Sequence, residues 1–572
     1  MPTPDIKTKQ RAERKKCLDD ILASKARWKL IAAGPGTGKT YTFKEILAQR
    51  AGGNNLAITF INKLADEMKS ALGENAEVKT FHAYCKKILH EQNGRVDLAP
   101  YLTMIIERDA ELLGNGFSGF TAKFQTLAET SPELAFHLRR GDYYEAVGFD
   151  DAVYRLLKQV QKNPDVLPNF DQIVVDEFQD FNPLEVAFIR EIAKKGDLLI
   201  VGDDDQAVYS GRSASPNFLR QFFRSGKFET FPLPYCSRCT SVVVDATNNI
   251  IQTAQALDLF TDRIPKPYEC YLESKEADSL RYPKLLLARC TLAKVIPKYI
   301  KREIEQIPPE DIAESRAEKD GYPTVLIVGS KQYLVEIEKQ LKPQFPQLEY
   351  TPSQEYEYGI REAYEWLRRD EKSNLGWRII LEVCCSGKIL KQAIQTSESG
   401  KPMVELLDAK LVKRHLRVLE ILNRVADGDT LAGAEIDELE SILGSETGNV
   451  IDHFTPKEVI EAEELNKLHP TIKLTSFVGC KGLSAGHVFI VGANAGSIPK
   501  NPAEIQDLEI SQFIVALTRT RKCCHILSNK WLVKPTDREG NYQQPDVPSP
   551  FISWIGARLI CNRGELSAKD FK

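Results

Sequence analysis

Long hydrophobic runs are missing from this sequence: none approaches the roughly 20 apolar residues that a membrane-spanning helix needs. The chain starts MPTPDIKTKQRAERKK, a charged stretch that no apolar segment follows, so we expect no secretory signal. Internal repeats and low-complexity segments are also absent from the sequence. Together these absences predict a soluble protein that stays in the cytoplasm and has no contact with a membrane.

The sequence also lacks an excess of basic charge, since its net charge is −4. A protein without a global positive field does not bind nucleic acid over its whole surface. Any contact with DNA must therefore be confined to a groove. With 572 residues, 42% of them hydrophobic, the chain is long enough for roughly three to five domains.

Cysteines are present, but not in the pattern of a disulfide framework or a zinc finger. The 12 cysteines are scattered along the chain, which favours reduced thiols in a cytoplasmic protein. Cys236 and Cys239 form a CxxC pair without a second pair or a histidine at zinc-finger spacing, so we expect no metal there. Cys523, Cys524 and His525 lie in a strand-like run and are expected to belong to a hydrophobic core.

One segment has the pattern of a phosphate-binding loop. Residues 33–40 read AGPGTGKT and lie between an apolar run and a helical pattern. Backbone N–H groups at the helix start can surround phosphate oxygens, while Lys39 would neutralise the β- and γ-phosphates and Thr40 would hold Mg²⁺. The pattern GxxxxGK[ST] is missed only at its first glycine, which is Ala33 here. The predicted nucleotide-binding residues are Ala33, Gly34, Pro35, Gly36, Thr37, Gly38, Lys39 and Thr40.

A second apolar run ends in the carboxylates of Asp176 and Glu177, which places both at the tip of a strand. Asp176 suits a magnesium ion, directly or through water, and Glu177 suits the polarisation of an attacking water molecule. A solvated acidic strand end is the alternative interpretation. The presence of a phosphate-loop motif in the same chain favours a nucleoside triphosphatase.

Four more segments place polar or aromatic residues beside apolar runs. In order they read TFINK at 59–63, TFH at 80–82, GDDDQ at 202–206 and VALTR at 515–519. With DEFQD at 176–180, this ordered set resembles the superfamily 1 DNA helicases of the UvrD, Rep and PcrA type. The resemblance covers most of the chain, from about Gln10 to Asn529.

This resemblance implies an α/β fold in which two RecA-like parallel sheets face each other. ATP and Mg²⁺ would lie in the cleft between them, and single-stranded DNA would cross the top of both lobes. Strands alternate with helical patterns in both halves, as parallel sheets require. The expected division is a first lobe at 1–90 and 165–275, a helical insertion at 91–164, a second lobe at 276–355 and 470–545, a shortened helical insertion at 356–469 and a C-terminal tail at 546–572.

The resemblance also implies roles around the triphosphate. Gln206 would sense the γ-phosphate from the first lobe, and Arg519 would reach it from the second. Arg238 would reach the same phosphate, and a surface arginine in a weak ion pair is the alternative for both arginines. Gln10 matches the family's adenine-reading glutamine, with an ordinary exposed glutamine as the open alternative. The predicted catalytic residues are Lys39, Glu177, Gln206, Arg238 and Arg519.

Around the base, the sequence departs from the family pattern. The family has Asn-Tyr-Arg, with the tyrosine ring on adenine, where this chain has Cys236, Ser237 and Arg238. Tyr41 follows GKT in place of the usual arginine, and we expect its ring to form the floor of a one-sided adenine pocket. Ordinary helix packing of Tyr41 is the alternative.

The expected DNA contacts differ from the family as well. Gly211 stands where a tryptophan usually stacks on a base, and such stacking contributes about 1 to 3 kcal/mol. We therefore expect a weaker grip on the strand, and for each remaining aromatic ring core packing competes with base stacking. The predicted DNA contacts are Thr59, Phe60, Asn62, Lys63, Thr80, Phe81, His82, Tyr209, Arg212 and Lys481.

A basic helical pattern occurs far from these motifs, at Lys410, Lys413, Arg414 and Arg417. The apolar positions between them make the pattern amphipathic. A helix that contacts duplex DNA is one interpretation, and a solvated charged face is the one we favour.

The motifs together predict a DNA-dependent ATPase that moves 3′ to 5′ along single-stranded DNA and separates strands at junctions with duplex, using ATP and Mg²⁺. The alternative is a switch subunit that hydrolyses ATP and regulates a partner such as a nuclease, with little unwinding of its own. A motor that acts on RNA also stays open, since backbone and stacking contacts do not report the sugar.

Overall fold

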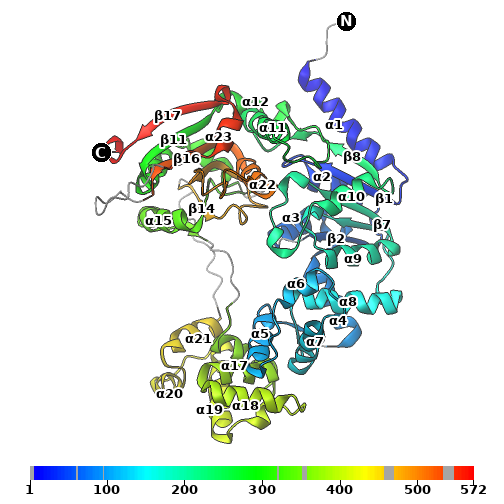
Figure 1. Cartoon of the computed structure of the whole chain (residues 1–572), viewed down its shortest axis with the longest axis vertical. Helices are drawn as coiled ribbons and strands as arrows, with labels where there is room; N and C mark the ends of the chain where they lie inside the picture. The colour runs from blue at the N-terminus through cyan, green and yellow to red at the C-terminus, as the bar shows by residue number, and fades with distance from the viewer. Residues whose placement is uncertain are drawn as a thin grey trace.

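The computed structural model describes residues 5–59, 62–94, 96–317, 321–350, 357–456, 469–532 and 546–571. Two sheets, of six and seven strands, form the centres of two lobes, and helices pack around both (Figure 1). Every ladder in the two sheets is parallel, which confirms the predicted α/β class. Within the described part of the chain, no helix is long and apolar enough to cross a membrane.

The first sheet contains the strands that precede the sequence motifs, in the order β3, β2, β6, β7, β1, β8. Its central strands are buried at nearly every position, as expected for parallel strands covered on both faces. Because the strands are parallel, their carboxyl ends meet at one edge, where ligand sites form in such sheets. The strands are β1 (Trp28–Ala33), β2 (Asn55–Thr59), β3 (Glu77–Thr80), β6 (Gln172–Val175), β7 (Asp197–Gly202) and β8 (Glu229–Leu233).

Helix α1 precedes the first strand, and the other helices of the first lobe come after strands of this sheet. Helix α9 shows how the sequence sets a boundary: Asn182 and Glu185 form a capping box around Pro183, which has no N–H to leave unsatisfied. The helices are α1 (Ile6–Ala23), α2 (Lys39–Ala48), α3 (Asn62–Leu72), α4 (Phe81–Asn93), α9 (Pro183–Ile192) and α10 (Asn217–Arg224).

Two helical regions interrupt the lobes and pack against each other at the end of the molecule away from the sheets (Figure 1). The first contains β4 (Asp97–Leu98), α5 (Leu102–Leu113), α6 (Phe120–Gln125), α7 (Pro132–Tyr144), β5 (Ala146–Val147) and α8 (Phe149–Lys162). The second contains α16 (Ile360–Arg369), α17 (Asn374–Cys384), α18 (Gly387–Ser397), α19 (Ala409–Ala426), α20 (Gly433–Leu443) and α21 (Thr447–Phe454). They share one hydrophobic core.

A buried ion network crosses the contact between these two regions. Asp109 on α5 accepts from Arg140 on α7, with Nη2 2.7 Å from Oδ2, and from Arg378 on α17, with Nε 2.8 Å from Oδ1. None of the three side chains is more than 1% exposed. Removing the carboxylate would leave two buried cations without their shared partner.

The second sheet has the order β13, β14, β12, β15, β16, β11, β17. Its strands are β11 (Leu285–Leu292), β12 (Val325–Val328), β13 (Glu349–Tyr350), β14 (Ile472–Thr475), β15 (Ala485–Val491), β16 (Thr520–Trp531) and β17 (Ile560–Leu566). Around it lie α13 (Ile296–Glu305), α14 (Pro309–Ser315), α15 (Lys331–Leu341), α22 (Asp507–Leu517) and α23 (Pro550–Ile555).

Two expected boundaries need correction. The segment 546–572, expected as a tail, contributes α23 to the second core and β17 to the second sheet, where β17 pairs with β11. Helix α11 (Ser241–Ala256) falls within the stretch expected in the first lobe, yet its apolar face packs with α22 and α23. Between α11 and β11 lie β10 (Glu269–Cys270), which pairs with β9 (Tyr235–Cys236), and α12 (Leu272–Arg281).

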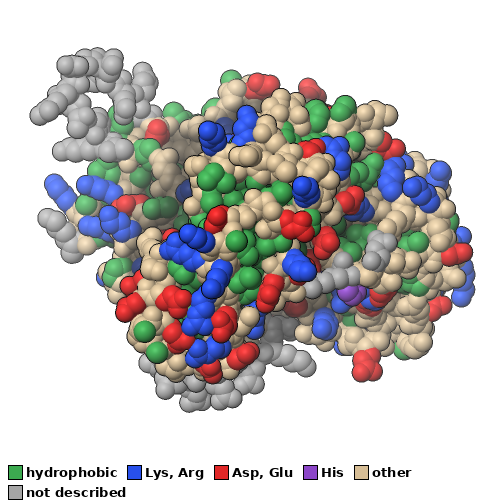
Figure 2. Space-filling model, turned by 90° about the horizontal axis from the view of Figure 1, so that it is seen from below, with side chains coloured by type: hydrophobic (Ala, Val, Ile, Leu, Met, Phe, Trp, Pro, Cys, Tyr) green, Lys and Arg blue, Asp and Glu red, His purple; other side chains and the backbone are tan. Residues whose placement is uncertain are grey.

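Charges of both signs mix on the surface. Seen from below, lysine and arginine side chains alternate with aspartate and glutamate side chains (Figure 2). On α19, Arg417 lies 2.8 Å from Glu420 and 3.4 Å from Glu438, and Arg414 donates to the carbonyl of Ser441. The cations of this helix are partly paired within the insertion, in agreement with a solvated charged face.

Candidate nucleotide site between the two lobes

The phosphate-loop motif forms the turn between β1 and α2. Gly36 and Gly38 have φ angles of +72° and +90°, which an L side chain rarely adopts. Ala33 is the last residue of β1, so replacing the motif's first glycine by alanine introduces no backbone strain. The loop is also tightly packed, because a Cβ on Gly36 would lie 2.5 Å from Cβ of Arg238. Lys39 and Thr40 begin α2.

Lys39 meets both carboxylates of the acidic motif. Its Nζ lies 2.7 Å from Oε1 of Glu177 and 3.9 Å from Oδ1 of Asp176. Glu177 has a φ of +53°, an unusual conformation for a glutamate. Burial raises the pKa of Asp176 to about 6. Burial by itself would raise the pKa of Glu177 as well, but the charges of Lys39 and Lys481 outweigh it and lower that pKa.

A chain of hydrogen bonds leads from Glu177 to the second lobe. Gln179 donates from Nε2 to Oε2 of Glu177 at 2.5 Å and accepts the backbone N–H of Asp203 at 2.9 Å. Asp203 in turn accepts from Nε2 of Gln206 at 2.6 Å. The remaining oxygen of Gln206 accepts from Nη2 of Arg519 at 2.7 Å. The predicted catalytic residues Glu177, Gln206 and Arg519 therefore form one connected network.

Among the residues that the structure describes, neither of the two predicted arginines has an acidic partner. Arg519 is buried, and besides Gln206 it donates to the carbonyls of Val515 and Leu483. Arg238 lies beside the phosphate loop and forms no ion pair or hydrogen bond within the described ranges. A guanidinium that no carboxylate neutralises is suited to meet an incoming phosphate.

The side chain of Lys481 lies in the contact between the two lobes and not on a surface open to DNA. Instead of facing DNA, its side chain is buried and crosses to the first lobe, where it pairs with Asp180 and donates to the carbonyl of Gln206 at 2.7 Å. Its Nζ is also 3.6 Å from Oε2 of Glu177. The same ammonium lies 5.5 Å from the ring centre of Tyr209. The prediction of Lys481 as a DNA contact is therefore wrong for this arrangement.

Other predicted DNA contacts are also turned inward. Phe81 is fully buried and packs edge-on against Phe181 and Phe188, so its assignment as a base-stacking ring is wrong. Burial lowers the pKa of His82 to about 3, so His82 provides no positive charge near neutral pH.

The remaining predicted contacts lie near the ends of β2 and β3 or beside them. Thr59 is buried, Thr80 caps α4 by accepting the N–H of Ala83, and Arg212 lies 3.2 Å from Glu185. Tyr209, Thr59 and Thr80 are partly or fully covered by protein. Phe60 and the side chains of Asn62 and Lys63 lie outside the described residues.

The structure contradicts an adenine-reading role for Gln10. Its side chain is 6% exposed, donates to the carbonyl of Cys270 and accepts the N–H of Leu272, both at 3.0 Å. Both ends of the amide are thus occupied by the segment that joins β10 to α12. Gln10 positions that segment against α1.

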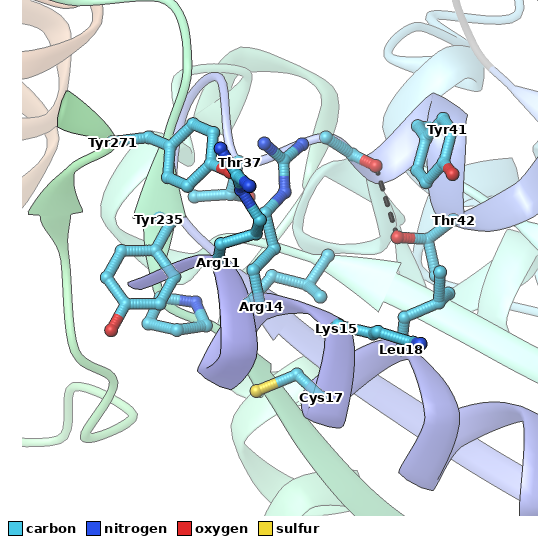
Figure 3. A pocket seen from close by; sticks show the side chains of 13 residues that line it. Arg11, Arg14, Lys15, Cys17, Leu18, Thr37, Tyr41, Thr42, Tyr235 and Tyr271 are labelled. Atoms are coloured by element: carbon cyan, nitrogen blue, oxygen red, sulfur yellow. Dashed lines mark hydrogen bonds between the residues drawn. The ribbon is translucent and has the colours of Figure 1, made fainter. Parts of the chain in front are cut away.

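Beside the phosphate loop lies a cavity of about 400 Å³ (Figure 3). Tyr41, which is 53% exposed, lies at one side of it, and Tyr235 and Tyr271 lie at the other. The guanidinium of Arg14 lies 4.6 Å from the ring centre of Tyr271 and donates to Oγ of Ser237 at 3.0 Å. The sequence pointed to Tyr41 but gave no signal for Arg14 or Tyr271, which follow no recognisable motif.

The three aspartates of GDDDQ are already neutralised by protein. Lys266 places its ammonium 3.0 Å from Asp203, 2.6 Å from Asp204 and 2.9 Å from Asp205. The ammonium therefore fills the position where three converging carboxylates would otherwise suit a cation. No sequence signal identified Lys266, because about 60 residues separate it from the motif.

Comparison with known proteins agrees with the motifs. A family model described as an AAA domain matches residues 19–212. The ATP-dependent DNA helicase PcrA of Staphylococcus aureus is 26% identical over 367 residues, which is 53% of this chain and 49% of that protein. PcrA of Leuconostoc citreum is 28% identical over 308 residues, 44% of this chain and 40% of the relative. The chain thus matches about half the length of these curated relatives or less.

Proposed function

We propose that this chain, a superfamily 1 protein of the UvrD, Rep and PcrA type, is an ATP-dependent DNA helicase. Single-stranded DNA stimulates its ATP hydrolysis, which drives 3′-to-5′ movement and strand separation. The observation that carries the proposal is the hydrogen bond from Arg519 to Gln206, which joins the second lobe to the triphosphatase motifs of the first. The name of the PcrA relatives, ATP-dependent DNA helicase, supports the same activity.

The phosphate loop and the acidic motif bind the triphosphate and its metal in this proposal. Lys39, whose ammonium now contacts Glu177 at 2.7 Å, would exchange this carboxylate for the β- and γ-phosphates. The hydroxyl of Thr40 and the carboxylate of Asp176 are hard oxygen donors of the kind that Mg²⁺ prefers. Mg²⁺ supplies charge neutralisation of the phosphates when bound.

Glu177 acts on the attacking water. Gln179 and the left-handed backbone fix its carboxylate, and its lowered pKa keeps it ionised. When the phosphates replace Glu177 as the partner of Lys39, the carboxylate of Glu177 becomes available to orient the water and accept its proton.

The two arginines couple hydrolysis to the position of the lobes. Arg519 from the second lobe and Arg238 beside the loop would both turn to the γ-phosphate, and an arginine in that role can contribute roughly 10³ to 10⁵ in rate. Loss of the γ-phosphate after hydrolysis removes the charge that holds Arg519 in the cleft. The lobes then move relative to each other, and we propose this movement as the motor step.

The cavity next to the loop is the proposed base subsite. Tyr41 provides one aromatic face, and Arg14 stacked on Tyr271 provides a cationic face across the cavity. With Gln10 occupied elsewhere, base recognition rests on stacking. We also propose the division into two motor lobes with helical insertions, with α11 and β17 assigned to the second lobe.

One structural feature favours a second candidate function, a DNA-dependent ATPase switch that regulates a partner such as a nuclease. The side chains of Phe81 and Lys481 are buried, and Gly211 stands where the family has a stacking ring. We therefore expect a lower affinity for single-stranded DNA than the sequence motifs alone suggest. A motor with a weak grip would hydrolyse ATP and separate few strands.

Tailed duplexes test the two candidates. The purified chain is given ATP, Mg²⁺ and duplexes with a 3′ or a 5′ single-stranded tail at low salt, because phosphate contacts weaken steeply with salt. The helicase proposal predicts DNA-stimulated hydrolysis and displacement from the 3′ tail only. Hydrolysis without displacement supports the switch, and matched RNA strands test the sugar preference. Absence of DNA-stimulated hydrolysis contradicts both candidates.

A further inference from the structure

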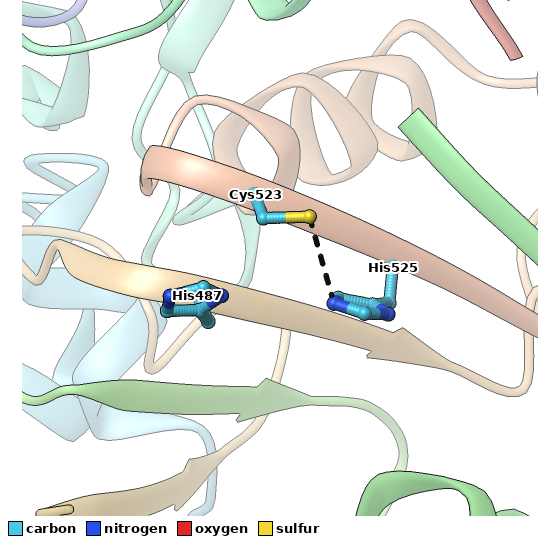
Figure 4. A group of neighbouring side chains, drawn as sticks. All are labelled: His487, Cys523 and His525. Atoms are coloured by element: carbon cyan, nitrogen blue, oxygen red, sulfur yellow. Dashed lines mark hydrogen bonds between the residues drawn. The ribbon is translucent and has the colours of Figure 1, made fainter. Parts of the chain in front are cut away.

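Three potential metal ligands meet on one face of the second sheet, away from the nucleotide site. His487 on β15 and Cys523 on β16 are paired in register, and His525 follows two positions later on β16. Side chains alternate along a strand, so these three side chains lie on the same face (Figure 4). They are 4%, 5% and 3% exposed, and their ligand atoms all lie within 4.8 Å of one another.

The spacing of these atoms fits a tetrahedral ion. With ordinary zinc distances to sulfur and nitrogen, two ligands at the tetrahedral angle are about 3.6 Å apart. Sγ of Cys523 and Nε2 of His525 are 3.6 Å apart. The ligand atom of His487 lies within 4.8 Å of both of these atoms.

Each histidine has a hydrogen-bonding partner on one ring nitrogen, as metal-bound histidines commonly do. Nε2 of His487 lies 3.2 Å from a carboxylate oxygen of Asp311, and Nδ1 of His525 lies 3.1 Å from the hydroxyl of Tyr299. A second partner on the far ring nitrogen fixes the tautomer and orientation of a metal-binding imidazole.

The local charges also permit a cation. Lys522 is the nearby ammonium, and it lies 2.6 Å from both Asp311 and Glu314, so two carboxylates compensate its charge.

We propose that His487, Cys523 and His525 bind one Zn²⁺ ion that fastens β15 to β16, with solvent providing the fourth ligand. On binding, a zinc–sulfur bond forms and the thiol proton of Cys523 passes to solvent. No oxidation or reduction is involved. Because two of the ligands are imidazoles and one is a thiolate, the site suits zinc better than Mg²⁺ or Ca²⁺.

Metal content of the full-length protein tests this proposal independently of ATP hydrolysis. The chain is produced in zinc-supplemented medium, passed over a desalting column and analysed by mass spectrometry for metals. About one zinc per chain is expected. Cys523→Ser is expected to lower zinc content at least about 10-fold, and Tyr299→Phe to weaken zinc affinity about 10-fold through its effect on His525. Full zinc content in Cys523→Ser, or unchanged zinc affinity in Tyr299→Phe, contradicts the proposal.

The matched control is Cys524→Ser, the next residue on the same strand, whose side chain belongs to the core on the opposite face. It is expected to keep the full zinc content. If Cys523→Ser does not fold, Co²⁺ titration of the chelator-treated wild-type chain decides instead: a thiolate-to-cobalt absorption band supports the site. Metal-free wild-type protein without that band, or equal zinc loss in both serine variants, overturns the proposal.

Discussion

Arg519 of the second lobe donates a hydrogen bond to Gln206 of the first, with Nη2 2.7 Å from Oε1. The other end of the Gln206 amide is held by Asp203 at 2.6 Å, so the glutamine has a fixed orientation. The partner of Arg519 is a neutral amide, and its guanidinium charge is therefore available to an anion. A γ-phosphate beside Gln206 would attract Arg519 and strengthen this contact between the lobes.

Arg519→Ala is expected to lower kcat for ATP hydrolysis by at least about 10³-fold, because the transition-state charge loses its guanidinium from the second lobe. Affinity for MgATP should change much less, since Lys39 and the loop stay intact. Steady-state ATPase assays and nucleotide titration measure the two quantities. Arg519→Lys should not restore the rate, because an ammonium cannot reproduce the planar donor fork. A wild-type kcat in Arg519→Ala would contradict this role.

Tyr41→Ala is expected to weaken MgATP binding roughly 5- to 10-fold, because stacking on an aromatic ring contributes about 1 kcal/mol. Fluorescent-nucleotide titration gives the dissociation constant. Tyr41→Phe keeps the ring and serves as the control, with affinity close to wild type. An unchanged constant in Tyr41→Ala would show that its ring does not touch the base.

The pH dependence of hydrolysis should report Asp176. Burial raises its pKa to about 6, so the carboxyl takes up a proton as the pH falls through about 6. Mg²⁺ binds only the ionised form, and kcat/KM is therefore expected to fall below about pH 6. Raising Mg²⁺ should shift this acidic limb to lower pH.

Asp180 provides the control for this assignment, because burial raises its pKa to about 6 as well. Its partner is Lys481 and not a proposed metal ligand. The shift of the acidic limb with Mg²⁺ should persist in Asp180→Asn. If the acidic limb of the kcat/KM profile of the wild-type chain does not shift with Mg²⁺ concentration, Asp176 is excluded as the group that titrates there.

Asp109→Ala is expected to destabilise the contact between the two helical insertions by about 3 kcal/mol, because Arg140 and Arg378 lose their shared buried carboxylate and keep only Glu398 and Glu382, which are partly exposed. Urea unfolding followed by limited proteolysis of the insertions measures the change. Arg108→Ala removes an exposed neighbour and should change stability by less than about 1 kcal/mol. Equal stability of the two variants would mean that the network contributes nothing to the contact.

The sequence predicts the position of a site residue well where its motif directly follows a strand of the parallel sheet. Lys39 and Glu177 are 138 positions apart yet meet at 2.7 Å, because each follows a parallel strand whose carboxyl end lies at the same edge. The family resemblance implies that Gln206 and Arg519 approach the same γ-phosphate from the two lobes, and the structure places them in direct contact. Local pattern and parallel topology were sufficient for these residues.

The sequence could not predict the direction in which the other motif side chains point. The sequence predicts Phe81 as a base-stacking ring with core packing as the competing interpretation, and its contacts with Phe181 and Phe188 decide for the core. Gln10 was assigned by its motif, but the segment from Cys270 to Leu272 occupies its amide. Lys266, which pairs with three aspartates, belongs to no motif. Each outcome depends on tertiary contacts between distant segments.

Strand displacement by a Lys39→Ala variant tests the central claim most directly, that cleavage of one triphosphate between the lobes drives movement on DNA. The assay uses a duplex with a 3′ tail, ATP and Mg²⁺, with ATP hydrolysis followed in the same samples. The variant is expected to bind the tailed DNA as the wild type does, and to lose hydrolysis and displacement together. Displacement at the wild-type rate by the Lys39→Ala protein would contradict the account.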